Sequence, residues 1–181
     1  MKYNKGFTLV ELMIALVISS FVLLGITSTY SSIQGSIQVS KDLENAQEVI
    51  RYSSQVFTRS LKQTISSPTI SLDTKSVTVI QPANTRSCFG TIVGVDYQET
   101  FTFVSPNLSC STQDSAGNPL VANTIILTGI NDFSAQYNNA NELFSFVIEP
   151  TVLPENFVVG GVPGIRIDVA LTSRILANNI P

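Results

Sequence analysis

No proline occurs before Pro68, and the first part of this segment is apolar on all sides. Leu12–Ile26 has no polar stripe, and no charged residue lies between Leu12 and Ser40. A helix of this kind belongs in lipid or in a protein core. Phe7–Ile26 has about the length, roughly 20 residues, that crosses a bilayer. We therefore predict a membrane-spanning helix that begins near Phe7.

After Ile26 the pattern becomes amphipathic, with apolar side chains at about 3.6-residue spacing and most charges on the opposite face. The predicted apolar face comprises Ile33, Ile37, Leu43, Ala46, Ile50, Phe57, Leu61 and Ile65. One helix from Phe7 to about Ile65 would be about 88 Å long at about 1.5 Å per residue. Gly25 and Gly35 are its weakest points, because a glycine in a helix interior costs about 1 kcal/mol of helix stability relative to alanine. Only part of such a helix can pack inside a small domain.

Beyond Pro68 the hydrophobic period falls to two residues, which is typical of β-strands. The predicted strands are Thr69–Leu72, Ser76–Ile80, Thr91–Tyr97, Glu99–Val104, Thr124–Ile130, Phe133–Tyr137, Leu143–Ile148 and Ile165–Thr172. Asp73–Lys75 is expected to form a tight hairpin turn, and Ser105–Asn123 a long loop that contains Cys110. Because the amphipathic helix needs an apolar partner, we predict an α+β fold with an antiparallel sheet packed on the helix.

Composition and charge argue against several classes of function. Charged residues make up 13% of the chain, compared with about 25% in average soluble domains. The net charge of −3 offers nucleic acid no basic surface. Histidine is absent, so the commonest general base and metal ligand is missing. The aspartates lack the spacing of a calcium site. We expect no enzymatic activity, no cofactor, no metal and no direct nucleic-acid contact.

Residues 5–11 read KGFTLVE and stand directly before the apolar run, and this arrangement resembles the type IV prepilin signal. An ordinary secretory signal is cut after its apolar segment, which is then lost. The resemblance implies instead a cut between Gly6 and Phe7 by a separate prepilin peptidase, which also methylates the amine of Phe7. Lys2 and Lys5 would hold the leader, residues 1–6, on the cytoplasmic side of the membrane.

Glu11 is the one carboxylate at the start of the apolar helix, where a charge costs about 2.5–3.5 kcal/mol on insertion scales. In pilin-like filaments a glutamate at the fifth mature position pairs with the N-terminal amine of a neighbouring subunit. Glu11 holds that position, so the resemblance gives it this role in assembly. There are two other interpretations of this segment. In the first, it is an ordinary single-pass membrane anchor and the match to the prepilin motif is accidental. A secretory signal cut near Ser19 or Thr27 would leave Glu11 unexplained.

The two cysteines, Cys88 and Cys110, are too far apart for a redox or zinc CxxC motif. An export signal implies an oxidising compartment, in which a disulfide between them is favoured. Such a bridge would stabilise the domain by about 3 kcal/mol on the loop-closure model. The alternative is a pair of buried free thiols.

Within the superfamily, the C-terminal half most resembles PilW-like minor pilins and the J-type minor pseudopilins of type II secretion. The segments that carry this resemblance are Leu127–Tyr137, LTGINDFSAQY, and Ile165–Arg174, IRIDVALTSR. Major pilins usually carry a proline in the first helix, and this chain has none there. The implied pilin-like fold has a transmembrane half at residues 7–30, an amphipathic half at 31–67 and a sheet domain at 68–181.

The resemblance implies a minor pilin that primes or caps a type IV pilus near its tip. Its partners would be other minor pilins, the major pilin, the prepilin peptidase and the inner-membrane assembly platform. It would cross the inner membrane once, with a periplasmic C-terminal domain, and then enter the extracellular pilus. The alternatives are a J-type minor pseudopilin, or a binding module at the tip for adhesion or DNA uptake.

Overall fold

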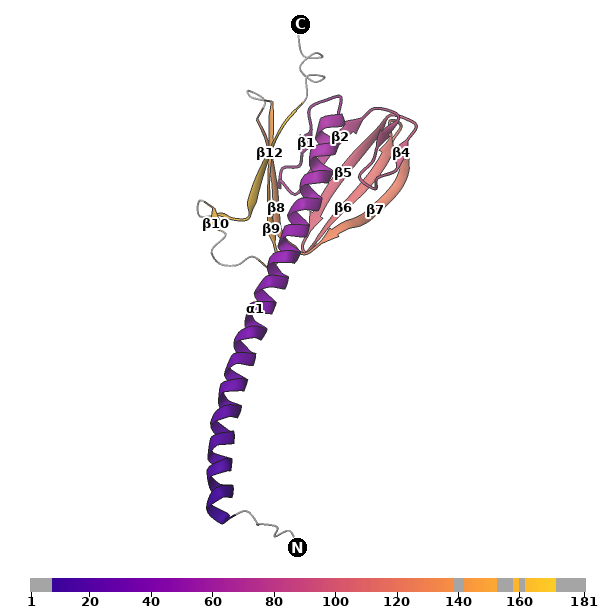
Figure 1. The fold of residues 1–181 in the computed structure, drawn as a ribbon. Helices are drawn as coiled ribbons and strands as arrows, with labels where there is room; N and C mark the ends of the chain where they lie inside the picture. Colours follow the sequence, from indigo (N-terminus) through magenta and orange to yellow (C-terminus); the bar gives the residue numbers. More distant parts are fainter. Residues whose placement is uncertain (1–7, 139–141, 153–157, 160–161, 172–181) are drawn as a thin grey trace. The chain divides into compact units, whose positions relative to one another are not determined.

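The computed structural model describes residues 8–138, 142–152, 158–159 and 162–171. Contacts divide the chain into two compact units, Met1–Lys41 and Asp42–Pro181. One long helix, α1 (Leu9–Gln63), runs through the boundary between them (Figure 1). The remaining described elements are antiparallel strands, so the predicted α+β, pilin-like architecture is confirmed.

The described part of the first unit is helical from Leu9 onward, and every side chain in it is exposed. Several of its hydroxyls bond back to backbone carbonyl oxygens of the helix. The hydroxyls of Ser19 and Ser20, for example, donate to the carbonyl oxygens of Leu16 at 3.0 Å and Val17 at 2.7 Å. Hydroxyls bonded back to the helix are compatible with hydrocarbon surroundings. The segment is long and apolar enough to cross a membrane, and none of its most apolar window is buried.

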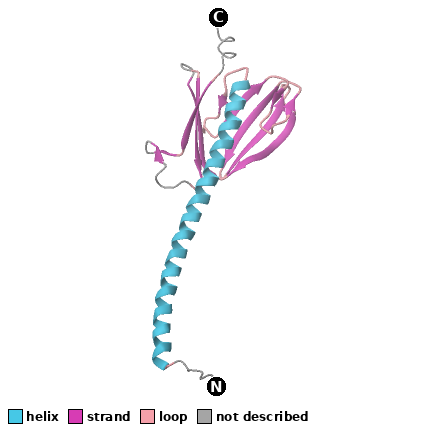
Figure 2. Cartoon of the chain, in the orientation of Figure 1, coloured by secondary structure: helices cyan, strands magenta, loops and turns pink. Residues whose placement is uncertain are grey.

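The second unit contains the strands, arranged in two main sheets and two short pairs (Figure 2). A five-stranded sheet has the order β1-β2-β5-β6-β7, a three-stranded sheet has the order β12-β9-β8, and β3-β4 and β10-β11 form the pairs. The strands are β1 (Thr69–Ile70), β2 (Ser76–Gln81), β3 (Thr85–Arg86), β4 (Ile92–Val93), β5 (Tyr97–Val104), β6 (Asn107–Asp114), β7 (Pro119–Thr128), β8 (Ile130–Asn138), β9 (Leu143–Pro150), β10 (Val158–Val159), β11 (Val162–Pro163) and β12 (Ile165–Ala170).

Within the second unit, the helix segment 42–63 packs against both main sheets through Phe57. The ring centroid of Phe57 lies 4.7 Å from that of Phe101 on β5, 5.5 Å from Phe133 on β8 and 4.7 Å from Phe146 on β9. Aromatic pairs of this kind contribute about 0.5–1.5 kcal/mol each beyond their buried area. The sequence predicts that Phe133, Ala135 and Tyr137 face the helix; Phe133 and Ala135 are buried, and Tyr137 is half-buried.

The buried residues of α1 differ from the predicted apolar face, and the helix ends earlier than predicted. Ile33 and Ile37 are exposed, and they belong to the first unit rather than to the unit that contains the strands. The buried helical residues are Ala46, Val49, Ser53, Val56, Phe57, Ser60 and Leu61. The helix ends at Gln63 rather than near Ile65, whose N–H donates to the Ile80 carbonyl oxygen at 3.2 Å and so leaves the helical ladder.

The predicted loop at Ser105–Asn123 is wrong, because most of this segment forms β6 and the first half of β7. β6 is rich in small polar residues and shows no hydrophobic alternation, yet its backbone pairs with β5 on one side and β7 on the other. Thr91–Tyr97 contains only the two-residue β4 before β5 begins. Thr124–Ile130 is interrupted at Gly129, whose φ of 89° separates β7 from β8.

The other predicted strands are present with shifted ends, and β1 and β2 pair across the expected turn. The Asp73 side chain stabilises that turn, because it accepts the Lys75 N–H at 3.1 Å and the Ser71 hydroxyl. Lys75 then links the two main sheets through an ion pair with Asp132 and a 2.7 Å bond to the Phe133 carbonyl oxygen. Thr172, the predicted end of the last strand, lies outside the described residues.

Candidate functional site

The first helical turn of α1 is closed by two side chains, Thr8 and Glu11. The Glu11 N–H donates to Thr8 Oγ1 at 3.3 Å, while the Thr8 N–H and hydroxyl each donate to Glu11 Oε2 at 3.2 Å. This reciprocal pattern is a capping box, with Thr8 at the N-cap and Glu11 three residues later. It satisfies backbone donors that a helix start otherwise leaves unpaired.

The capping box also determines where the Glu11 carboxylate lies. The partial positive charge of the helix N-terminus favours a carboxylate in the first turn. Glu11 is exposed, and the bonds found in the described chain use Oε2. The carboxylate therefore combines a local structural role with room for a cationic partner. Gly6 and Phe7, the predicted cleavage and methylation residues, lie outside the described residues.

This local role of Glu11 was not predicted from the sequence, although the sequence carries a signal for it. The spacing of threonine and glutamate three residues apart, just before an apolar run, is a known sequence pattern for a helix start. This pattern is independent of any partner of Glu11 in another subunit. The structure shows a partner for Glu11 within its own chain.

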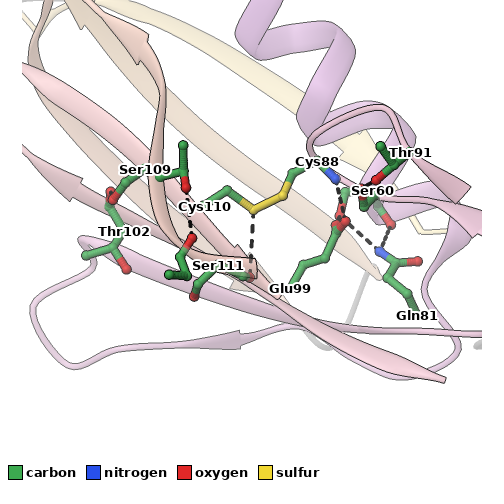
Figure 3. The surroundings of a disulfide bond; sticks show 12 residues. Ser60, Gln81, Cys88, Thr91, Glu99, Thr102, Ser109, Cys110 and Ser111 are labelled. Atoms are coloured by element: carbon green, nitrogen blue, oxygen red, sulfur yellow. Dashed lines mark hydrogen bonds between the residues drawn. A yellow bond between two sulfur atoms is a disulfide. The ribbon is translucent and has the colours of Figure 1, made fainter. Parts of the chain in front are cut away.

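Cys88 and Cys110 form the expected disulfide in the second unit (Figure 3). Cys88 lies between β3 and β4, and Cys110 lies in β6 opposite Phe101 of β5. The bond therefore ties the β3–β4 hairpin to an inner strand of the five-stranded sheet. Both cysteines are buried within the main hydrophobic cluster.

Beside the disulfide lies a buried carboxylate, Glu99 of β5, which the sequence analysis did not identify. Its Oε1 accepts the Cys88 N–H at 2.6 Å, and its Oε2 accepts the Ser60 hydroxyl at 2.6 Å (Figure 3). Gln81 donates to both oxygens of Ser60, at 2.8 and 2.9 Å. Burial raises the pKa of Glu99, and the bonds from Ser60 and Cys88 only partly oppose that shift.

We expect the pKa shift of Glu99 to make the unfolding free energy depend on pH. Because its pKa is higher in the folded state, the folded chain retains a proton that the unfolded chain loses as pH rises above about 4.5. The unfolding free energy therefore falls as pH rises from about 4.5 through the pKa that Glu99 has in the folded state. Glu99→Gln should flatten the dependence, and Glu99→Ala should cost about 1–3 kcal/mol because two buried donors lose their acceptor.

The measurement is urea unfolding of the full chain in mild detergent across the acid and neutral range. Glu44→Gln is the control, because Glu44 is an exposed carboxylate on α1, the helix that carries Ser60. The control should keep the wild-type pH profile. An unchanged profile in Glu99→Gln would show that the Glu99 carboxylate does not couple folding to pH.

The described residues contain no group of three or more histidine, cysteine, aspartate or glutamate side chains that could hold a metal ion. The fold thus positions two polar sites of different kinds. The Glu99 cluster joins the helix, β5 and the β3–β4 hairpin within one unit. The Thr8–Glu11 turn, at the start of an exposed apolar helix, is the candidate functional site.

Comparisons with known proteins bear on this N-terminal site. Residues 1–27 match the family model described as the prokaryotic N-terminal methylation motif. Searches of curated proteins and of solved structures found no match. The motif supports a place in the type IV pilin superfamily, as a pilin or pseudopilin, and it fits a structural subunit rather than an enzyme. It implies processing by a prepilin peptidase, membrane anchoring and assembly with other pilins.

Proposed function

We propose that this chain is a minor pilin that is cut after Gly6, methylated at Phe7 and packed into a type IV pilus. The observation that carries this proposal is the exposed helix of the first unit, which begins at the Thr8–Glu11 turn. Its apolar side chains are exposed, and burying such a surface is worth about 25 cal/mol per Å². Lipid covers it first, and the helices of neighbouring subunits cover it in the filament.

In this proposal Glu11 guides each subunit into register. Its Oε2 faces the N-terminal turn of its own helix, and the methylated amine of a neighbour's first residue approaches the same carboxylate. In a dry filament core an unpaired carboxylate is strongly penalised, whereas a paired one fixes the stagger between helices. Charge neutralisation and register then come from one contact.

The minor role rests on two features. The helix continues without interruption from Leu9 to Gln63, whereas major pilins usually carry a proline in this helix. The segments Leu127–Tyr137 and Ile165–Arg174 resemble PilW-like minor pilins, with J-type pseudopilins as the second candidate. We infer a place near the tip, with the second unit periplasmic before assembly and extracellular afterwards.

Shearing cells that make the filament tests this proposal. The chain should appear in the membrane fraction and, at low abundance, in the sheared filament fraction. An inner-membrane protein without a prepilin signal serves as the control for contamination and should stay with the membranes. If the chain is confined to membranes in cells that carry filaments, it is not a filament subunit.

A further inference from the structure

Strand β7 forms one edge of the five-stranded sheet, and no strand pairs with its outer side in the described part of the chain. All ten of its residues are exposed or half-exposed. No charged residue occurs between Asp114 and Asp132. A long, uncharged and partly apolar edge is a template for pairing with another chain, and natural proteins usually protect such edges.

The other edges of the two main sheets in the described chain carry such protection. β1 is only two residues long. β12 carries Arg166 and Asp168, whose guanidinium Nε and carboxylate Oδ1 lie 2.8 Å apart on the exposed surface. β8 carries Asp132, which pairs with Lys75. β7 has neither charge nor short length, so its outer edge stands apart from these three.

The C-terminal half of β7 is the part best suited to pairing. Two of the three irregularities in its register with β6 fall between Pro119 and Thr124, and one falls within Thr124–Thr128. Irregularities of this kind twist an edge and disturb its hydrogen-bonding row. The segment Thr124–Thr128 therefore presents the more regular row of outward backbone groups.

A groove of about 600 Å³ lies directly beside this half of β7, between the strand and helix segment 42–63. Its apolar lining includes Val49 and Tyr52 of the helix, Ile126 of β7 and Val152 after β9. Glu48 is the only carboxylate in the lining. Alternate side chains of a strand added to β7 would point toward this groove.

We propose that Thr124–Thr128 receives an extended, uncharged and largely apolar strand from a different pilin-like subunit. Outward N–H and C=O groups of β7 would bind its backbone, and the groove would take its alternate side chains. This inference rests on the proposed function, because the donor is a filament subunit. Pairing with β7 of a second copy would be isologous and would close at two chains, whereas a filament needs contacts that propagate. Among the described edges of this chain, only β7 is both long and free of charged residues. A second copy therefore offers no other edge of this kind as the donor strand.

The test places the photo-cross-linking residue p-benzoylphenylalanine at Ile125 of the full chain, in cells that make the filament. Ile80 is the matched control, because it is an exposed isoleucine on the inner strand β2, at 45% exposure against 56% for Ile125. Ile125 should cross-link to a different protein that carries the N-terminal methylation motif, and Ile80 should not. A cross-link from Ile125 to a second copy of this chain, or none at all, overturns the proposal.

A second readout reports on the backbone. Amide hydrogens of Thr124–Thr128 should exchange at least about tenfold more slowly in sheared filaments than in the membrane form. Ile125→Lys should lower recovery in filaments by at least about tenfold relative to Ile80→Lys, at equal membrane levels. If wild-type chain enters filaments while these amides exchange at the membrane-form rate, strand addition is wrong and the filament role stands. If wild-type chain never enters filaments, the proposed function itself fails.

Discussion

Glu11→Ala should be processed and inserted in the membrane like wild type, yet enter filaments at least about tenfold less well. The reason is energetic, because removing one partner of a buried charge pair costs about 3–5 kcal/mol. Glu11→Asp should be intermediate at best, since its shorter side chain withdraws the charge from the neighbour's amine. The measurement compares sheared filament fractions with membrane fractions for each variant.

The capping box makes a sharper control possible. Thr8→Ala removes the hydroxyl that bonds Glu11 and should cost the helix start about 1 kcal/mol, but it leaves the carboxylate in place. Under the pairing hypothesis, Thr8→Ala assembles far better than Glu11→Ala, and Glu44→Ala assembles normally. Equal assembly defects in Thr8→Ala and Glu11→Ala would show that Glu11 acts only as a helix cap. Normal assembly of Glu11→Ala would show that assembly needs neither the charge pair nor the helix cap.

Gly6→Val should abolish processing, so that full-length precursor accumulates in the membrane and no mature chain reaches filaments. The peptidase must approach the backbone closely at this position, and a branched side chain there obstructs it. Asn4→Val is the matched control, because it introduces the same side chain two residues upstream. Immunoblots of membranes measure the ratio of precursor to mature chain. Efficient maturation of Gly6→Val would place the cleavage site elsewhere.

The long helix was predictable because its signals are local. A charge-free apolar run and the absence of proline before Pro68 indicate a helix without reference to the rest of the chain. The buried face was harder to place, because Ser53 and Ser60 lie on it. Ser60 is buried through its bond to Glu99, which is distant in sequence and comes close only in the folded chain.

β6 shows why part of the sheet escaped the sequence analysis. Its residues Ser109, Cys110 and Thr112 are buried although two of them are polar, so the strand has no period-two hydrophobic signal. Its structure depends on backbone pairing with β5 and β7 on both sides. Glu99 escaped for a related reason, since a glutamate on a strand is normally expected to face water.

The functional features likewise differ in how far the sequence predicts them. The N-terminal site was the easiest to predict. Its motif could be read directly from residues 5–11, and the family model matches residues 1–27. The disulfide could be inferred from the compartment that the motif implies, and the structure contains it. The capping box could have been read from spacing alone. The open edge of β7 could not, because only the folded sheet shows which strand lacks a neighbour.

The central claim is that this chain loses its leader before the apolar helix and carries that helix into a filament. Mass spectrometry of the N-terminal peptide of wild-type chain from sheared filaments tests it most directly. We expect a peptide that begins at Phe7 with a methylated amine. A chain that still begins at Met1, or one that begins near Ser19 or Thr27, would contradict it.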